Sequence, residues 1–220
     1  LVMNIDSGVD GNHPALSARW RGNSVHASHA WYGPGSFPTD NDSHGTHTMG
    51  TMTGMDPVTG DTVGVAPGAE WIAAATIGTS YSWVDAFQWA MNPDGNPLTT
   101  DDMPDVINNS FYVGSSAGGG CLASSYANLF NAVEAVGIAA VWSAGNAGPN
   151  PQTITGPKNI NTNLVNVWAT GNIDGNNPNL PIRSSSSRGP SGCGGTGSLL
   201  IKPEAVAPGT SVRSTVPGGG

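Results

Sequence analysis

The sequence predicts an α/β fold with a mostly parallel central sheet and helices on both of its faces. Short apolar runs, which are typical of buried strands, alternate with longer segments of helical period, as expected when helices connect parallel strands. Gly, Pro, Asn or Ser residues bound each run and favour turns at its ends. The predicted strands are residues 2–6, 71–77, 105–109, 138–143 and 164–169.

Residues 82–91 and residues 124–136 are predicted to be amphipathic helices. In each segment, four large apolar side chains recur at roughly helical spacing. Residues 92–104 and residues 171–197 are rich in Pro, Gly, Asn or Ser, so we expect both to be surface loops. A chain of 220 residues is long enough for a sizeable core, and we expect a single domain.

The charge of the chain excludes two classes of partner. Seven Lys and Arg residues against 15 Asp and Glu residues give a net charge of −8, which argues against nucleic-acid binding and against a polybasic membrane patch. The longest apolar stretches, residues 71–77 and 138–144, are far shorter than the roughly 18 to 20 residues that span a bilayer. We therefore expect no membrane span.

Two compositional features bear on where the protein works. Charged residues are few and lysine is scarce, which favours a secreted, extracellular protein. Cys121 and Cys193 both lie in Gly- and Ser-rich segments, and the sequence is equally compatible with a disulfide and with two separate thiols.

The chain begins directly on a predicted strand and ends at Gly220 without a closing helix or strand, so we expect both ends to be cut.

An acid and a histidine are the first candidates for chemistry. In open α/β sheets, functional groups gather beyond the carboxyl ends of the strands, and Asp6 ends the first predicted strand. His44 stands at the entrance of a segment that can start a helix. A neutral imidazole accepts a proton from a nucleophile when a fixed acceptor holds its other nitrogen, and Asp6 can be that acceptor. Taken alone, Asp6 is more typical of a turn or cap residue.

Asn146 is the third candidate, since it follows the predicted strand at residues 138–143 and has small neighbours that permit close approach. Its carboxamide can donate a hydrogen bond to a developing oxyanion, although an isolated Asn here is more typical of a turn. A metal site at His44 and His47 is disfavoured, because the spacing and the Glu of a zinc-protease helix are missing and no Cys lies nearby. We expect His47 to be structural.

These three segments together resemble the subtilisin-like serine protease family. Residues 5–10 (Ile-Asp-Ser-Gly-Val-Asp), followed by His-Pro, are similar to its Asp box. Residues 43–47 (Ser-His-Gly-Thr-His) are similar to its His box, and residues 143–146 (Ser-Ala-Gly-Asn) to its oxyanion-hole segment. Further similarity at residues 64–69, 81–84, 106–110 and 207–209 extends the resemblance over nearly the whole chain. Within the family, residues 6–16, 19–23 and 70–74 look closest to the bacillopeptidase F branch.

The resemblance implies a three-layer, subtilisin-like fold, incomplete at both ends, and the activity of a serine endopeptidase. It implies that Asp6 orients His44, that His44 deprotonates the nucleophilic Ser, and that Asn146 holds the oxyanion. The implied substrates are peptides or proteins. The resemblance also implies a monomer that requires no cofactor, and it is compatible with a pro-segment.

The resemblance also implies a substrate cleft with two walls. Ser110, Phe111 and Tyr112 would form one wall and pair with an extended peptide, and Ser143, Ala144 and Gly145 would form the other. Tyr81, Val84 and Phe111 match positions that line an apolar pocket further along the substrate. Tyr112 stands where the family usually has Gly, so we expect a narrower primary pocket.

The nucleophile is missing from the sequence. The family's third box, Gly-Thr-Ser-Met-Ala, does not occur, and Ser211 in the similar Gly-Thr-Ser of residues 209–211 is followed by Val-Arg. We expect the nucleophilic Ser to lie beyond residue 220. We also expect the 220 residues alone to have almost no peptidase activity, because loss of that Ser lowers kcat by about 2 × 10⁶-fold in a subtilisin-type triad.

Two other functions and a calcium site are less favoured by the sequence. A catalytically inactive peptide-binding module would keep the cleft without the Ser, but the joint presence of Asp6, His44 and Asn146 weighs against it. A nucleotide-binding domain would need a Gly-rich turn after a strand, which the sequence lacks. Calcium is common in the family, and residues 40–42 (Asp-Asn-Asp) carry oxygen donors, but they do not supply six to eight ligands, so a solvated acidic loop is favoured.

Overall fold

A computed structural model describes residues 1–113, 124–160, 163, 167–193 and 196–219 of the chain. The described residues divide into two compact units. Unit 1 comprises Leu1–Asn108 together with Arg213–Gly220, and unit 2 comprises Asn109–Val212.

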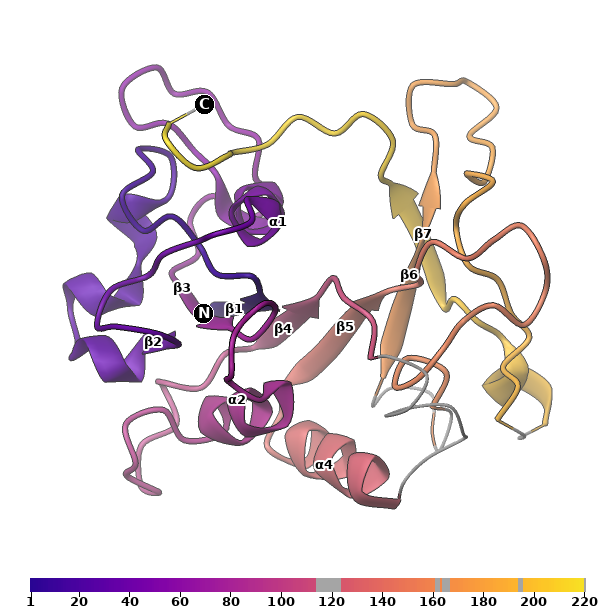
Figure 1. The fold of residues 1–220 in the computed structure, drawn as a ribbon, viewed down its shortest axis with the longest axis horizontal. Helices are drawn as coiled ribbons and strands as arrows, with labels where there is room; N and C mark the ends of the chain where they lie inside the picture. Colours follow the sequence, from indigo (N-terminus) through magenta and orange to yellow (C-terminus); the bar gives the residue numbers. More distant parts are fainter. Residues whose placement is uncertain (114–123, 161–162, 164–166, 194–195, 220) are drawn as a thin grey trace. The chain divides into compact units, whose positions relative to one another are not determined.

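Unit 1 is built on parallel strands in the order β2-β3-β1-β4 (Figure 1). β1 (Val2–Asp6) pairs with β3 (Trp71–Ala75) from Val2 opposite Trp71 to Asp6 opposite Ala75, and every residue of both strands is buried. β2 (Trp31–Tyr32) pairs with the outer side of β3. β4 (Val106–Asn109) follows β1 in the order, and its last residue already belongs to unit 2.

The helices of unit 1 lie on opposite sides of these strands, α1 (His44–Thr53) on one side and α2 (Trp83–Ala90) on the other (Figure 1). The connection from β1 to β2 contains three short 3₁₀ helices, η1 (Ser17–Arg19), η2 (Arg21–Asn23) and η3 (Ala27–His29). The Ser82 side chain caps α2 by accepting hydrogen bonds from the backbone N–H groups of Val84 and Asp85.

Unit 2 contains the parallel strands β5 (Ala139–Ser143), β6 (Trp168–Ile173) and β7 (Ala205–Pro208) in that order. α4 (Ser124–Ala135) contacts β5, and the 3₁₀ helix η4 (Gly197–Leu200) precedes β7. The alternation of strands and helices in both units confirms the predicted α/β class. No helix in the described part of the chain is long and apolar enough to cross a membrane.

Four of the five predicted strands and both predicted helices agree with the structure within two residues, but β6 was misplaced, and β2 and β7 were not predicted. The predicted strand at residues 164–169 lies instead at Trp168–Ile173, and residues 164–166 are outside the described residues. The expected loop from residue 171 therefore begins inside a strand. Gly171 belongs to the predicted loop because residues 171–197 are rich in Pro, Gly, Asn and Ser, yet a Cβ at Gly171 would lie 2.9 Å from Pro203 Cγ. Close packing, and not hydrophobicity, keeps this position small.

The state of one cysteine is now defined. Cys193 is disulfide-bonded, and Cys121, the only other cysteine of the chain, lies outside the described residues. A disulfide is typical of proteins that fold in an oxidising compartment.

Gly45 determines how closely α1 approaches the loop after β1. A Cβ at this position would lie 2.0 Å from the carbonyl oxygen of Gly8, a contact with backbone that no side-chain rotation relieves. We expect Gly45→Ala to destabilise the protein by at least about 2 kcal/mol in urea unfolding. Gly68→Ala is the matched control, since a Cβ at Gly68 meets nothing within 4 Å. Equal stabilities would contradict the close approach.

Candidate functional site

The carboxylate of Asp6 and the imidazole of His44 form a short hydrogen bond at the carboxyl end of β1. His44 Nδ1 lies 2.7 Å from Asp6 Oδ1. Because a carboxylate only accepts, Nδ1 carries the hydrogen, and Nε2 of the neutral ring is left with a lone pair. Asp6 is 0% exposed, whereas the His44 side chain is 49% exposed. The imidazole is therefore fixed at one nitrogen and accessible to solvent, a geometry that suits a general base.

Asp6 itself is held by its neighbours. Its Oδ1 also accepts a 2.7 Å hydrogen bond from the backbone N–H of Ser7, and its Oδ2 lies 3.4 Å from Thr48 Oγ1. The hydrogen bond from His44 to Asp6 raises the pKa of His44 above its usual 6.5 against the opposing effect of burial, and Asp42 and Asp40 add to the increase. The site thus stabilises a positive imidazolium.

Asp40 positions the start of α1, a role that the sequence did not reveal. Ser43, at the N-cap, has a left-handed backbone (φ 86°) and makes no side-chain cap. Asp40 accepts hydrogen bonds instead from the backbone N–H of Ser43 and of Asp42, from the N–H and hydroxyl of Thr46, and from the hydroxyl of Ser7. Burial opposes ionisation of Asp40, but these hydrogen bonds outweigh it and lower its pKa.

The same contacts argue against calcium at residues 40–42. Both carboxylate oxygens of Asp40 already accept hydrogen bonds from the protein, so a cation would have to displace them. Within the described ranges, no three His, Cys, Asp or Glu side chains are grouped so as to hold a metal ion. The donor set at Asp40 does not fit a calcium site.

Asn4 is a second residue that the sequence did not single out. It is fully buried in β1, and its amide donates to Gly45 O (3.1 Å) and Thr48 Oγ1 (2.8 Å). Its Oδ1 accepts a 2.8 Å hydrogen bond from Asn108 of β4. Asn4 therefore ties α1 to two strands beneath His44. The signal available in the sequence was a single polar residue inside an apolar run.

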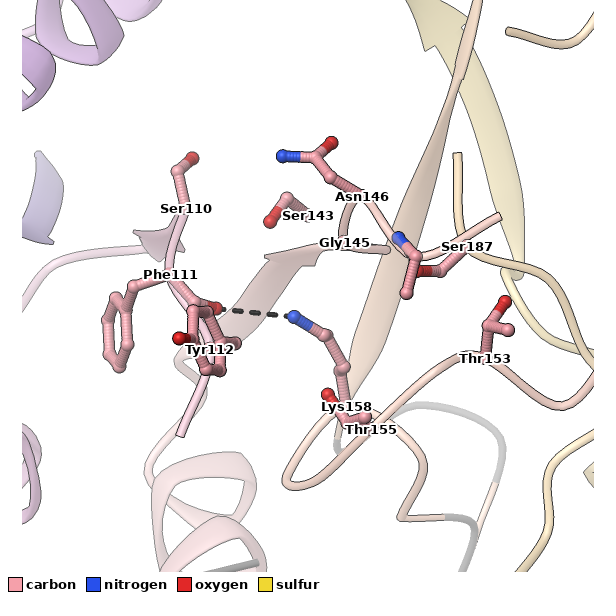
Figure 2. Close-up of a pocket in the computed structure, with 11 residues that line it drawn as sticks. Ser110, Phe111, Tyr112, Ser143, Gly145, Asn146, Thr153, Thr155, Lys158 and Ser187 are labelled. Atoms are coloured by element: carbon pink, nitrogen blue, oxygen red, sulfur yellow. Dashed lines mark hydrogen bonds between the residues drawn. The ribbon is translucent and has the colours of Figure 1, made fainter. Parts of the chain in front are cut away.

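Unit 2 contains a pocket of about 390 Å³, drawn in Figure 2. Two segments that were predicted to face each other across a cleft line this pocket together. They are Ser110, Phe111 and Tyr112 after β4, and Ser143 at the end of β5 with Gly145 after it; Asn146, the predicted oxyanion donor, lines the pocket beside them. The remaining lining residues are Ala147, Thr153, Thr155, Lys158 and Ser187.

The loop after β5 is held rigidly. The Ala144 N–H donates to Thr170 O (2.8 Å), and Ala144 is buried beneath the pocket and does not line it. Ser187 accepts at Oγ from the Ala147 N–H (3.0 Å) and donates its own N–H to Gly145 O (2.9 Å). Gly145 adopts φ +99°, a backbone conformation that glycine favours. Asn146 is exposed at the rim of the pocket (Figure 2).

The aromatic candidates are divided between the units. The Phe111 ring packs edge-on against the buried Trp142, with centroids 5.1 Å apart, whereas Tyr112 is 74% exposed. Tyr81 belongs to unit 1, where it lines a different pocket and contacts Tyr32 with centroids 5.2 Å apart. Val84 is half-buried in the first turn of α2 and does not line that pocket.

Lys158 is the one charged residue among the five lining residues that the sequence did not single out. It is 1% exposed, its Nζ lies 3.3 Å from the carbonyl oxygen of Phe111, and burial lowers its pKa to about 8. The available signal was the rarity of lysine, which occurs only at positions 158 and 202. Ser211, by contrast, lies in a bend after β7 with φ 56° and does not start a helix.

The fold is that of subtilisin-like proteases. Sphericase has a TM-score of 0.67 at 24% identity, over 99% of this chain and 69% of that structure, and the S41 psychrophilic protease has a TM-score of 0.66 at 24% identity, over 98% and 67%. The model of the subtilase family matches residues 1–219. The chain belongs to the subtilase family.

The chain spans less than half the length of two curated relatives that it matches. Bacillopeptidase F of Bacillus subtilis (strain 168) is 37% identical over 99% of this chain and 15% of its own length. Subtilisin E of the same organism is 28% identical over 99% of this chain and 49% of its own length. The predicted resemblance to the subtilases and to bacillopeptidase F is confirmed.

We expect the pKa of His44 to lie above 6.5 and to fall in Asp6→Asn, because an amide cannot stabilise the imidazolium as a carboxylate does. A titration of the His44 ring signals by NMR measures both values. Asp42→Asn is the matched control, since Asp42 acts on His44 by charge alone, and its effect should be smaller. An equal decrease in both variants would show that the short hydrogen bond is not the main cause.

Proposed function

We propose that this chain is part of the peptidase domain of a serine endopeptidase, in which Asp6 and His44 act with a serine that lies outside the 220 residues. The observation that carries the proposal is the 2.7 Å hydrogen bond between a buried carboxylate and an accessible imidazole, in a chain of the subtilase family. The relatives extend well beyond the span matched by this chain, which supports a nucleophile located elsewhere in the protein.

In the proposed mechanism, the lone pair of His44 Nε2 takes the proton from the serine hydroxyl as its oxygen attacks the scissile carbonyl carbon. Asp6 keeps the ring oriented and stabilises the imidazolium. His44 then gives the proton to the leaving amine as the C–N bond breaks, which leaves an acyl-enzyme. Water, deprotonated in turn by His44, attacks the ester, and return of the proton to the serine oxygen releases the acid.

Asn146 is proposed to donate its amide N–H to the oxyanion of the tetrahedral intermediate. Its exposed position at the rim of the unit 2 pocket supports this role, and the bonded loop of residues 144–147 limits its movement. Residues 110–112 and 143–145, all of which except Ala144 line the pocket, are proposed to bind an extended peptide substrate. Tyr81 and Val84 are proposed to contact the substrate further along.

We propose further that the protein acts outside the cell as a monomer. The disulfide-bonded Cys193 supports an oxidising compartment. We also propose that the protein has a pro-segment, and this part of the proposal is supported by the family resemblance alone. The 220 residues by themselves are proposed to be inactive, because they supply the acid and the base without the nucleophile.

Replacement of the three residues in the complete protein should separate their roles. We expect kcat to fall by about 10⁶-fold in His44→Ala, by about 10⁴-fold in Asp6→Asn and by about 10²–10³-fold in Asn146→Ala, each with little change in KM. Steady-state hydrolysis of a chromogenic peptide measures these losses. His26→Ala, which removes an exposed imidazole of unit 1, should stay near the wild-type rate.

The pH dependence provides an independent check. The base must be neutral, so kcat/KM should fall as the pH decreases through a His44 pKa above 6.5. If the complete protein binds peptides but does not cleave them at any pH, the peptide-binding module is the correct interpretation.

A further inference from the structure

Lys158 places a cation inside the unit 2 pocket without a carboxylate partner. None of the ion pairs found among the described residues involves Lys158, and none of the residues that line the pocket is acidic. The other lysine of the chain, Lys202, is also buried but pairs with Glu204. A buried charge is normally paired, so the unpaired ammonium of Lys158 needs an explanation.

The ammonium lies between the two segments that line the pocket (Figure 2). On one side, its Nζ donates to the Phe111 carbonyl oxygen at 3.3 Å. On the other side, it would lie 3.4 Å from a Cβ placed on Gly145. An ammonium has three N–H donors, and the Phe111 carbonyl takes one, so the other two can serve a ligand in the pocket.

The remaining polar side chains around the pocket are neutral: the amide of Asn146 and the hydroxyls of Ser, Thr and Tyr residues. Thr153 Oγ1 already donates to Asn150 O and accepts from the Arg188 N–H, and Ser187 Oγ accepts from the Ala147 N–H. Among the residues that the structure describes, Lys158 is thus the only charged one that lines this pocket. The chain as a whole carries a net charge of −8, so a positive pocket runs against its general electrostatic character.

A structural role explains this arrangement poorly. Holding the Phe111 carbonyl needs one hydrogen-bond donor, which a neutral side chain can supply without the cost of burying a charge. That burial lowers the pKa of Lys158 to about 8, and Lys158 is still mainly protonated at pH 7. An anionic ligand would satisfy the charge and the remaining donors together.

We propose that the pocket lined by residues 110–112, Ser143, residues 145–147 and Lys158 binds the carboxylate side chain of a substrate residue, Glu or Asp, immediately before the scissile bond. The inference rests on the proposed function, since it uses the position of Asn146 at the rim of the same pocket to place the scissile carbonyl there. A specificity for acidic residues would replace the apolar preference that an uncharged pocket of this size would show.

The test uses the complete protein and four peptide substrates that differ only in the residue before the scissile bond: Glu, Asp, Gln and Leu. We expect kcat/KM for Glu to exceed that for Gln by about 10- to 100-fold, the effect of a charge-assisted hydrogen bond. Lys158→Met, which keeps an unbranched apolar side chain close in length to the lysine stem and removes the ammonium, should remove the difference between Glu and Gln. Arg183→Met, which removes an exposed cation of unit 2 that does not line the pocket, should retain it.

A binding measurement separates this inference from the proposed function. The ε-carbon NMR signal of Lys158 is followed with an acetylated tetrapeptide amide that ends in Glu, and with the same peptide ending in Gln. We expect tighter binding of the Glu peptide and an increase in the pKa of Lys158 when it binds.

The outcomes are distinct. Cleavage of all four substrates with equal kcat/KM for Glu and Gln would overturn the carboxylate pocket and leave the peptidase intact. Absence of any cleavage would overturn the proposed function. The NMR comparison of the Glu and Gln peptides would then show whether the pocket binds a carboxylate. Equal binding of the Glu and Gln peptides would overturn the carboxylate pocket in either case.

Discussion

The buried carboxylate of Asp6 is the constraint on which the structure of unit 1 depends. A carboxylate that is 0% exposed is tolerated only when its oxygens accept hydrogen bonds, and Asp6 receives them from Ser7, Thr48 and His44. His44 can reach Asp6 because Gly45 brings α1 against the backbone of Gly8. Asn4 and Asp40 then fix the helix from below and from its N-terminus. The surrounding packing and hydrogen bonds thus serve to hold one ring in one orientation.

The sequence predicted the parts of this arrangement that depend on periodicity and on local motifs. β1 was predicted with its observed bounds because its residues before Asp6 are apolar, apart from Asn4, and the whole strand is buried. The acid and the histidine were found because each follows an element that the pattern marks clearly. β6 was misplaced because Gly171 and Asn172 look like loop residues, and only the packing of Pro203 on Gly171 shows why a small residue belongs in that strand.

The missed site residues share a different physical reason. Asp40 accepts four hydrogen bonds from residues 42–46 and one from the hydroxyl of Ser7, which is distant in sequence. These contacts form only when the loop folds onto the start of α1, so nothing in residues 40–42 distinguishes Asp40 from a solvated acidic loop. Lys158 is exceptional only through its burial, which depends on the loops around it. The spacing of apolar residues in a sequence predicts which of them are buried. It does not predict a buried lysine, since lysines are almost always exposed.

The contrast between the two lysines makes the burial of Lys158 informative. Desolvation lowers the pKa of both, but at Lys202 the hydrogen bond and charge of Glu204 act against the decrease, whereas at Lys158 nothing does. A pKa of about 8 in the folded state, against 10.5 for the ordinary side chain, corresponds to a destabilisation of roughly 3 kcal/mol at neutral pH. Because the pKa of Lys158 is lower in the folded state, this destabilisation is fully present below pH 8 and disappears as the pH rises towards 10.5.

Roughly 3 kcal/mol is a substantial fraction of the stability of a typical domain, and a bound carboxylate would offset this destabilisation only while the pocket is occupied. Stability alone would favour an apolar side chain at position 158, so the retained charge is best understood as a property of the pocket that serves its ligand.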